Sequence, residues 1–553
     1  MKRLLLFFLI SFLLSASAED ECVSAQEKRV DLYMSDDPPT LDTMDQVTSV
    51  AWFVQGHVFE GLMTVDKNMK ISPGVAEKYE WLPGNLGIRF HLRKNAKWSD
   101  GKPVTAHDFV FAWQQVVAPA KANQYAFIMY YVKNGEKISK GDLPLNELGA
   151  KAIDDYTLEV QLEKPCPFFL DLTVFVSYMP CREDFFKSRS KLSADGKAYT
   201  EMRYAATPAD MLYNGPYKLS SWVKRTGLKM ERNEHYWQPG LVKIHKINVN
   251  YISKEFRPNF ALFQSGKIAF TSLNDETLKS ALAAKLPLNT YNDGGFAYLE
   301  FNHRPKRSDR PDWQPIFANR NFRLAIQHAV KTDDIVNRII GIPGYRIGNS
   351  LIPHCIGDKT KPWPTQFPLP PIKYDVKIAR EYLEKARLEL KLEKFPAIDL
   401  LVTDDPTSIS QGEFLQYCLM RNLGLKLNLD LQTFKHRLQK QHDGDFDITF
   451  SSWGPDYNDP MTYVDLLWSK NENNHGAYNS AEYDALVTGA QNCADPVKRH
   501  QLFDQAQRHI RDHAVVVPLF ERAVVYVVHK KLKGMTRDCL GTDPCLIHAW
   551  IEE

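Results

Sequence analysis

Length is the feature that most constrains this chain, because 553 residues are far too many for one hydrophobic core. A single core stops growing at roughly 250–300 residues, so we expect two or more lobes. The chain contains no repeat, no low-complexity block and no long flexible linker. Short alternating segments such as 88–92 and 157–162 predict strands, and they mix with segments of helical periodicity such as 376–386, for which Asp375 is the predicted N-cap. The sequence therefore predicts an α/β protein whose lobes can enclose a cleft.

The N-terminus has the pattern of a secretory signal peptide. Two basic residues precede an apolar run at 4–14, and small residues at 16–18 complete a cleavage site. We therefore predict a signal peptide of residues 1–18, cleaved after Ala18, and an exported, soluble mature protein. No later apolar run approaches the roughly 20 residues that span a membrane, so we expect no direct membrane insertion.

The charge balance argues against a nucleic-acid partner. The chain has 69 basic residues, two of them in the signal peptide, which leaves 67 against 67 acidic residues in the mature protein. Nucleic-acid-binding domains typically carry a basic excess. We therefore expect no binding to nucleic acid.

Eight cysteines are candidates for disulfides in an exported protein, because the compartment outside the cytoplasm is oxidising. Cys539 and Cys545 flank a Gly-Thr-Asp-Pro turn, which makes them the first predicted pair. Cys166 and Cys181 are the second. The other four cysteines have no partner that the sequence identifies.

Catalytic and cofactor signatures are absent from the sequence. It contains no Gly-x-Ser-x-Gly elbow, no His-Glu-x-x-His, no phosphate-binding loop and no dinucleotide fingerprint. His107 and Asp108 resemble part of a catalytic dyad, but Thr105 before them has the position of a helix cap, so helix-start chemistry explains the pair. We therefore expect no catalytic residue, no cofactor, no built-in metal site and no enzymatic activity.

Nine segments along the chain have a common resemblance. They are Pro39-Thr-Leu-Asp42, Val58-Phe-Glu-Gly-Leu62, a stretch at 96–109 that contains Trp98-Ser-Asp-Gly-Lys-Pro103, Lys151-Ala-Ile-Asp-Asp155, Asn214-Gly-Pro-Tyr217, Asn233 to Trp237, Asn321-Phe-Arg-Leu-Ala325, a stretch at 453–460 that begins Trp453-Gly-Pro-Asp456, and Tyr478 with Tyr483-Asp484. In this order they resemble the large peptide-binding class of periplasmic solute receptors, known as extracellular solute-binding protein family 5. One such segment alone is weak evidence for this family, but nine segments in the right order are strong evidence.

The resemblance implies a two-lobed periplasmic-binding-protein fold with a hinge and an extra domain. It implies that the first lobe consists of 19–59, 186–294 and 523–553, its appended domain of 60–185, and the opposing lobe of 295–522. It also implies a monomeric receptor in the periplasm. Such a receptor captures an oligopeptide between its lobes, closes around it and delivers it to the membrane permease of an ABC importer.

The segment from Trp453 to Asp456, which includes Gly454, matches family residues that meet the ligand. A peptide in a closed cleft brings a buried ammonium group, and an unpaired buried charge is costly, so a carboxylate must pair with it. The resemblance gives this role to Asp456, and it makes Trp453 the wall of a side-chain pocket. On the residues alone, Asp456 could equally cap the turn that follows.

The resemblance implies further ligand contacts around the cleft. It places four side chains there and one stretch of backbone that pairs with the peptide. The side chains are those of Tyr125, Tyr298, Glu300 and Phe434, and the backbone stretch is Val47, Thr48 and Ser49. Pairing through the main chain lets such a site accept many peptide sequences.

The sequence departs from the family pattern where basic side chains meet the peptide carboxylate. Those positions hold residues that are not basic, namely Ile340, Ser408, Gln441 and Phe450. Either another cation meets the carboxylate, or the carboxylate protrudes to solvent, or the ligand lacks one. The departure concerns the length and chemistry of the ligand and leaves the receptor class unchanged.

Two alternatives to an oligopeptide receptor stay open. A receptor of the same fold can bind a murein peptide, a nickel chelate, haem or a sugar, because fold does not fix the ligand. The acid at Asp456 favours a ligand with an amine. The second alternative is an exported hydrolase with a site of unrecognised type.

Overall fold

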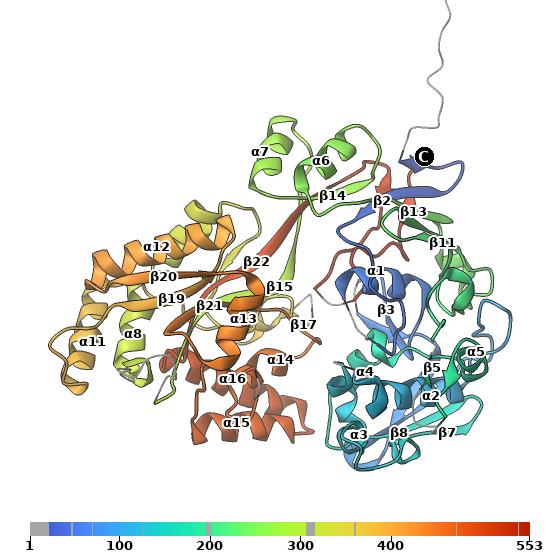
Figure 1. Ribbon diagram of the computed structural model, residues 1–553, viewed down its shortest axis with the longest axis horizontal. Coiled ribbons are helices and arrows are strands. Elements are labelled where there is room, and N and C mark those ends of the chain that lie inside the picture. The colour runs from blue at the N-terminus through green and yellow to red at the C-terminus, as the bar shows by residue number, and fades with distance from the viewer. Residues whose placement is uncertain are drawn as a thin grey trace, which may run out of the picture.

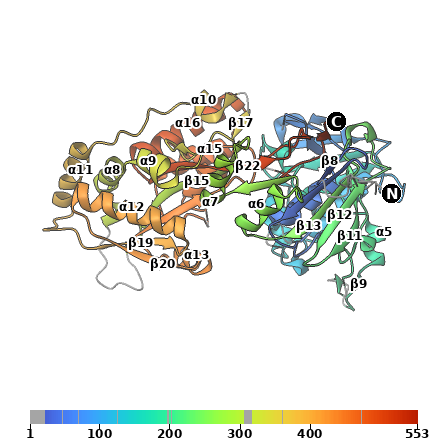
Figure 2. The same ribbon diagram turned by 90° about the horizontal axis from the view of Figure 1, so that it is seen from above.

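Two lobes connected by a pair of long strands make up the protein (Figure 1 and Figure 2). The computed structural model describes residues 22–45, 48–68, 70–123, 125–194, 199–200, 202–305, 316–358, 361–471, 473–539 and 541–553. The predicted signal peptide and Val47 lie outside these residues. In the described ranges, no helix has both the length and the apolar character needed to cross a bilayer.

The connecting strands are β15 (Asn289–Phe301) and β22 (Val516–Val528), which pair antiparallel. Their pairing register shifts between Asn292 and Phe296. Gly294 lies in this shift with a φ of 77°, and a Cβ there would lie 2.3 Å from Cδ of Pro455, so only glycine fits. The predicted lobe boundaries at 294/295 and 522/523 fall inside these two strands.

The first lobe contains a five-stranded sheet in the order β1-β2-β13-β12-β11, in which only β2 and β13 pair parallel. The strands are β1 (Val23–Ser24), β2 (Arg29–Met34), β11 (Tyr217–Val223), β12 (Gly227–Arg232) and β13 (Lys246–Ile252). The same lobe contains α1 (Ser49–Val58), β23 (Leu532–Lys533) and β24 (Trp550–Ile551), whereas α6 (Phe256–Gln264) and α7 (Asp275–Ala283) pack against the end of β22 near the connection between the lobes.

The segment predicted as an appended domain contains its own antiparallel sheet in the order β5-β6-β8-β7. These strands are β5 (Ala76–Trp81), β6 (Gly87–Leu92), β7 (Ala150–Asp154) and β8 (Thr157–Gln161). The helices are α2 (Ala106–Val116), α3 (Gly135–Ser139), α4 (Phe169–Leu172) and α5 (Glu183–Ser188). The segment also contains the hairpin of β3 (Met63–Val65) with β4 (Ile71–Pro73). The helix α5 runs past the predicted end of the segment at residue 185, and the hairpin of β9 (Lys191–Leu192) with β10 (Tyr199–Thr200) follows that end.

The second lobe is built on a sheet in the order β14-β22-β15-β21-β19-β20, with β16 also paired to β22. Besides the two long strands, these are β14 (Phe270–Leu273), β16 (Arg346–Ile347), β19 (Ile398–Thr403), β20 (Leu427–Gln432) and β21 (Ile448–Trp453). The helices are α8 (Arg320–Ala329), α9 (Thr332–Asp334), α10 (Trp363–Gln366), α11 (Val376–Glu389), α12 (Pro406–Leu423), α13 (Phe434–Asp443), α14 (Met461–Val464), α15 (Ala481–Gln491) and α16 (Pro496–Asp512). A small ladder joins β17 (Gly357–Asp358) to β18 (Lys361–Pro362).

Local capping chemistry explains where several helices begin. Asp108 in α2 accepts a hydrogen bond of 2.9 Å from the backbone N–H of Thr105 and so closes a capping box. The carboxylate of Asp375 accepts from the first N–H groups of α11. Both starts agree with the sequence prediction, and the role of Asp108 at the helix start removes the reason to consider a catalytic dyad.

Neither predicted disulfide is formed in the structure, because Cys166, Cys181, Cys539 and Cys545 are all reduced. The thiol of Cys539 contacts the thiol of Cys355, whereas Cys545 forms its side-chain hydrogen bond with Thr536. The thiol of Cys181 is bonded to the side chain of Tyr204 and not to Cys166. The predicted pairs are close along the chain, but their sulfur atoms point to other neighbours.

Candidate functional site

A cavity of about 200 Å³ lies between the two lobes. It is lined by α1, by the β3–β4 hairpin, by α4 and the residues after it, by loops of the second lobe and by the C-terminal segment of the first. The lining residues are Trp52, Val65, Lys70, Ile71, Asp171, Leu172, Val174, Phe175, Cys355, Gly357, Asp456, Tyr457, Asn458, Asp538 and Gly541. A ligand held here contacts both lobes, as a receptor that closes by hinge motion requires.

Asp456 presents a carboxylate to this cavity. It follows the end of β21, and its backbone N–H donates to Oγ1 of Thr462 at 3.1 Å, which fixes the turn. Its carboxylate has no hydrogen bond or ion pair with any residue that the structure describes. Burial alone raises the pKa of Asp456 to about 6. A cation from a ligand would relieve this desolvation, since an opposite charge favours the ionised acid.

Two further buried acids near Asp456 have raised pKa values, so they are partly or mostly protonated at pH 7. Burial, followed by the neighbouring charge of Asp456, raises the pKa of Asp465 to about 8. Across the cavity, burial and then the charge of Asp459 raise the pKa of Asp171 to about 7. Asp459 itself is neutralised by Arg499 through two hydrogen bonds. A positively charged group on a ligand bound beside these acids would lower their pKa values, because an opposite charge favours the ionised form.

Aromatic side chains form the wall opposite Asp456. Trp52 meets Phe175 edge-on with ring centroids 4.7 Å apart, and Tyr125 stacks on Phe175 at 5.9 Å. The pKa of Tyr125 is raised by burial and then by the charge of Asp456, so this predicted contact residue faces the acid from the other lobe. Phe168 also stacks on Tyr457 with centroids 4.4 Å apart, which joins the lobes beside the cavity.

Trp453 and Gly454 lead into the Asp456 turn. Trp453 ends β21, opposite Phe296 of β15, and its buried indole N–H has no hydrogen-bond partner among the described residues. Gly454 is exposed, with open space where a Cβ would project. Neither Trp453 nor Gly454 is among the residues that line the cavity. Of this segment, the structure places Asp456 at the cavity and the other two residues just before it in the chain.

Glu300 and Tyr298 belong to a different environment. Glu300 is buried and accepts hydrogen bonds from the N–H of Gly476 at 2.7 Å, from Oγ of Ser451 at 3.1 Å and from Nε2 of Gln441 at 3.4 Å. Tyr298 is also buried and shares the Ser451 hydroxyl. The hydrogen bonds of this network are all made within the second lobe, and its residues do not line the cavity. The ligand contacts predicted for Glu300 and Tyr298 therefore stay a prediction.

The remaining predicted contacts lie apart from the cavity. Phe434 begins α13 with 60% of its surface exposed, and the Arg437 guanidinium lies 5.3 Å from its ring centroid. Thr48 accepts the N–H of Ala51 at 3.2 Å and so caps α1. Ser49 is the first residue of that helix and borders a separate depression. The structure thus brings Tyr125 within electrostatic reach of Asp456, although Tyr125 is not among the residues that line the cavity, and neither are Phe434, Thr48 and Ser49.

The four departures from the family pattern do not share one pocket either. Ile340 is in the apolar core of the second lobe, Ser408 is in the first turn of α12, and Gln441 is in the Glu300 network. Phe450 is partly buried on β21. Arg437 is a buried cation in this network and donates to Oε1 of Gln441 at 2.6 Å.

Sequence reasoning missed two groups of polar residues. Asp171 stands alone in the apolar run that ends at Phe175, a pattern that gives no sign of a cavity acid. The expectation of no metal cluster also overlooked a visible signal, since His509 and His513 are four residues apart. Their donor atoms and that of Glu482 lie within 4.8 Å of one another.

Comparisons with known proteins agree with this geometry. The chain is 28% identical to the dipeptide-binding protein DppE of Bacillus subtilis over 535 residues, which cover 95% of this chain and 92% of that protein. It is 31% identical to the periplasmic oligopeptide-binding protein OppA of Salmonella typhimurium over 501 residues, 89% of this chain and 86% of the other. The solved structure of Listeria monocytogenes OppA bound to peptide superposes with a TM-score of 0.72 at 28% identity, covering 95% of this chain and 99% of that one. A profile described as bacterial extracellular solute-binding proteins, family 5 Middle, matches residues 70–475, and the chain belongs to this family of solute-binding receptors.

Proposed function

We propose that this protein is an exported, non-enzymatic receptor that binds oligopeptides between its lobes and delivers them to the permease of an ABC importer. The observation that carries the proposal is the unpaired carboxylate of Asp456 in the interlobe cavity. The peptide-binding relatives support it, because they match nearly the whole chain. Delivery to a permease and action as a monomer follow the same family pattern.

Binding proceeds in this proposal by charge pairing and closure. The α-ammonium of the peptide pairs with Asp456, and Tyr125 meets the same end of the ligand from the first lobe. Because both lobes gain contacts only when they approach each other, the ligand shifts the population towards the closed form. No bond of the ligand is broken, and the closed form is what the permease recognises.

The proposal is tested by identifying what the protein retains. Purified protein is incubated with a mixture of free and N-acetylated peptides, separated from unbound material, and the bound molecules are read by mass spectrometry. We expect intact peptides with free amino termini, whether of ordinary or murein type. Retention of haem, a sugar or a metal chelate would show that the ligand is not a peptide. Release of peptide fragments would show that the protein is a hydrolase.

A further inference from the structure

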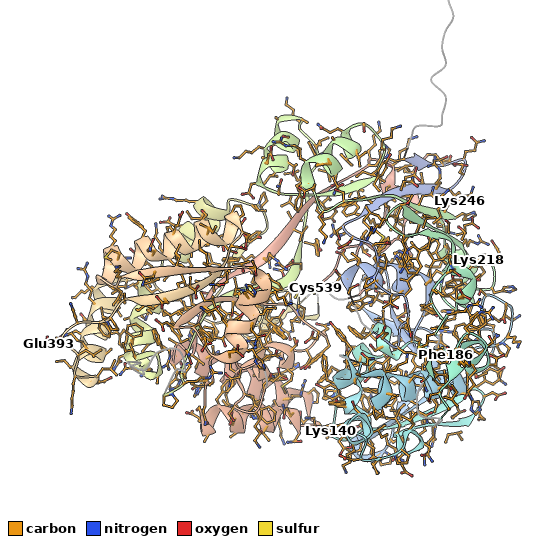
Figure 3. The ribbon with its side chains drawn as sticks, viewed as in Figure 1. Lys140, Phe186, Lys218, Lys246, Glu393 and Cys539 are labelled. Carbon is orange, nitrogen blue, oxygen red and sulfur yellow. The ribbon has the colours of Figure 1, made fainter. Side chains whose placement is uncertain are left out.

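Two cysteines from distant parts of the chain meet beside the interlobe cavity. Cys355 lies in the loop before β17, and Cys539 lies in the C-terminal segment after β23. The two thiols lie close enough to interact directly. Cys539 lies where the two lobes meet (Figure 3). This contact therefore connects a wall of the second lobe to a segment of the first.

Packing around the long strand β15 holds both cysteines in place. The hydroxyl of Tyr463 donates to the carbonyl of Gly294 at 2.6 Å and also contacts the thiol of Cys355. A Cβ on Gly294 would lie 3.1 Å from Cβ of Cys539, so the second cysteine packs against the same glycine. Cys355 lines the cavity, as do Asp538 and Gly541 on either side of Cys539. Two thiols that interact directly are placed to form a disulfide, whose S–S length is about 2.05 Å.

We propose that Cys355 and Cys539 form a disulfide that fastens the second-lobe wall of the ligand cavity to the C-terminal segment of the first lobe. The oxidant is another disulfide. One cysteine thiolate attacks it and forms a mixed disulfide as the first thiolate leaves. The second cysteine then attacks the mixed disulfide, closes the Cys355–Cys539 bond and expels the other thiolate, so that two electrons and two protons pass to the oxidant. In the cell this step rests on the proposed export, because disulfides persist in oxidising compartments.

Peptide mapping without reduction tests the bond directly and does not depend on ligand binding. The protein is equilibrated with oxidised glutathione, its remaining thiols are alkylated, and it is digested with trypsin together with a protease that cleaves before aspartate. The second enzyme separates residues 538–542, which contain Cys539, from 543–553, which contain Cys545. We expect a linked pair of peptides that contains Cys355 and Cys539. Linkage of Cys539 to Cys545, or alkylation of both Cys355 and Cys539, would overturn the proposal.

Thermal unfolding supplies a second readout. A cross-link between distant residues constrains the unfolded chain, so reduction should lower the melting temperature of the oxidised protein by several degrees. The Cys355→Ser/Cys539→Ser variant should melt at the reduced value with or without reductant. Cys493→Ser, which removes a partly buried thiol elsewhere, should keep the full shift. If reduction lowers the melting temperature of the double variant by the full amount, another pair of cysteines forms the disulfide. If the double variant does not fold, the peptide map decides.

A separate cluster on α15 and at the end of α16 carries a second inference. The rings of His509 and His513 stack with centroids 4.1 Å apart at the end of α16, and Nδ1 of His509 lies 3.6 Å from Oε2 of Glu482 on α15. Nδ1–H of His513 donates to the carbonyl of His509 at 3.1 Å, which leaves its Nε2 as the lone-pair donor. Tyr478 holds Nε2 of His509 at 2.8 Å, as a supporting group of a metal ligand does.

We also propose that Glu482, His509 and His513 bind a divalent transition metal ion such as Zn²⁺, with water completing its coordination. Two imidazoles and a carboxylate are a donor set that zinc accepts. Chelator-treated protein with its accessible thiols alkylated is titrated with ZnCl₂ in a calorimeter. We expect one bound equivalent in the wild type and in His442→Ala, whose histidine is exposed on α13, and its loss in His513→Ala and Glu482→Gln. Equal stoichiometry in all four proteins would overturn the site.

Discussion

Asp456 and Glu300 are two acids of the second lobe whose surroundings differ in one decisive respect. Burial is the largest cause of a raised pKa in both, to about 6 for Asp456 and about 7 for Glu300. Glu300 accepts three hydrogen bonds from its own lobe, whereas Asp456 faces a cavity without a partner among the described residues. Burial alone therefore does not identify a ligand-binding acid. The acid that still lacks a partner is the one positioned to bind.

The largest expected effect separates the two acids by affinity. Asp456→Ala should weaken binding of an unblocked peptide by about 2–5 kcal/mol, because it leaves the ligand ammonium unpaired in a desolvated site. Its free energy of unfolding should not fall, since the side chain has no partner to lose and its buried charge is unfavourable to folding at pH 7. Calorimetry and urea unfolding measure the two quantities. Asp404→Ala, which removes an exposed acid of the same lobe, is the control and should change neither. Unchanged affinity in Asp456→Ala would show that Asp456 does not bind the ligand and so does not differ from Glu300 in this respect.

Glu300 should give the opposite pattern. Glu300→Ala leaves the N–H of Gly476 and the hydroxyl of Ser451 without their acceptor, so it should lower the free energy of unfolding by about 1–3 kcal/mol. Peptide affinity should change little, because Glu300 does not line the cavity. Urea unfolding and calorimetry check both parts. A large loss of affinity in a folded Glu300→Gln protein would show that the family role predicted for this residue holds here.

The dependence of affinity on pH sharpens the comparison. With a pKa of about 6 in the free protein, Asp456 is mostly ionised at pH 7 and mostly protonated at pH 5. Only the ionised form pairs with ammonium, which stays charged over this range, so affinity should fall about tenfold from pH 7 to pH 5. Asp171 and Asp465 also titrate nearby, with pKa values of about 7 and about 8. The ratio of wild-type to Asp456→Asn affinity isolates the contribution of Asp456, and a ratio that is constant with pH would contradict it.

The smallest expected effect concerns the other end of the peptide. Because Ile340, Ser408, Gln441 and Phe450 supply no cation, amidation of the peptide C-terminus should weaken binding by less than roughly sixfold, the value of a solvated ion pair. Paired titrations of free and amidated peptide in moderate salt measure it. A loss of a hundredfold or more would mean that a basic residue, Arg304 or Arg437 for example, binds the carboxylate.

Local chemistry and family resemblance predicted different parts of this molecule. The capping acid Asp375 could be identified because its partners are the next residues along the chain. The ligand-binding role of Asp456 was predicted from the family resemblance, and the structure then placed this residue at a cavity. The partner of Cys539 could not be predicted, because Cys355 approaches it only after both lobes have folded around β15. Asp171 had no local signal for the same reason, since its cavity is formed by residues from both lobes.

The most direct test of the account is the affinity of one tripeptide with a free and with an acetylated amino terminus. Acetylation removes the charge that Asp456 is proposed to bind and leaves the rest of the ligand nearly unchanged. Calorimetric titrations of the wild type at pH 7 should show a loss of about 30-fold or more for the acetylated peptide, as expected for a buried charge pair. In Asp456→Asn the two peptides should bind within a few-fold of each other. Equal affinities for the wild type would contradict the pairing of ligand ammonium with Asp456.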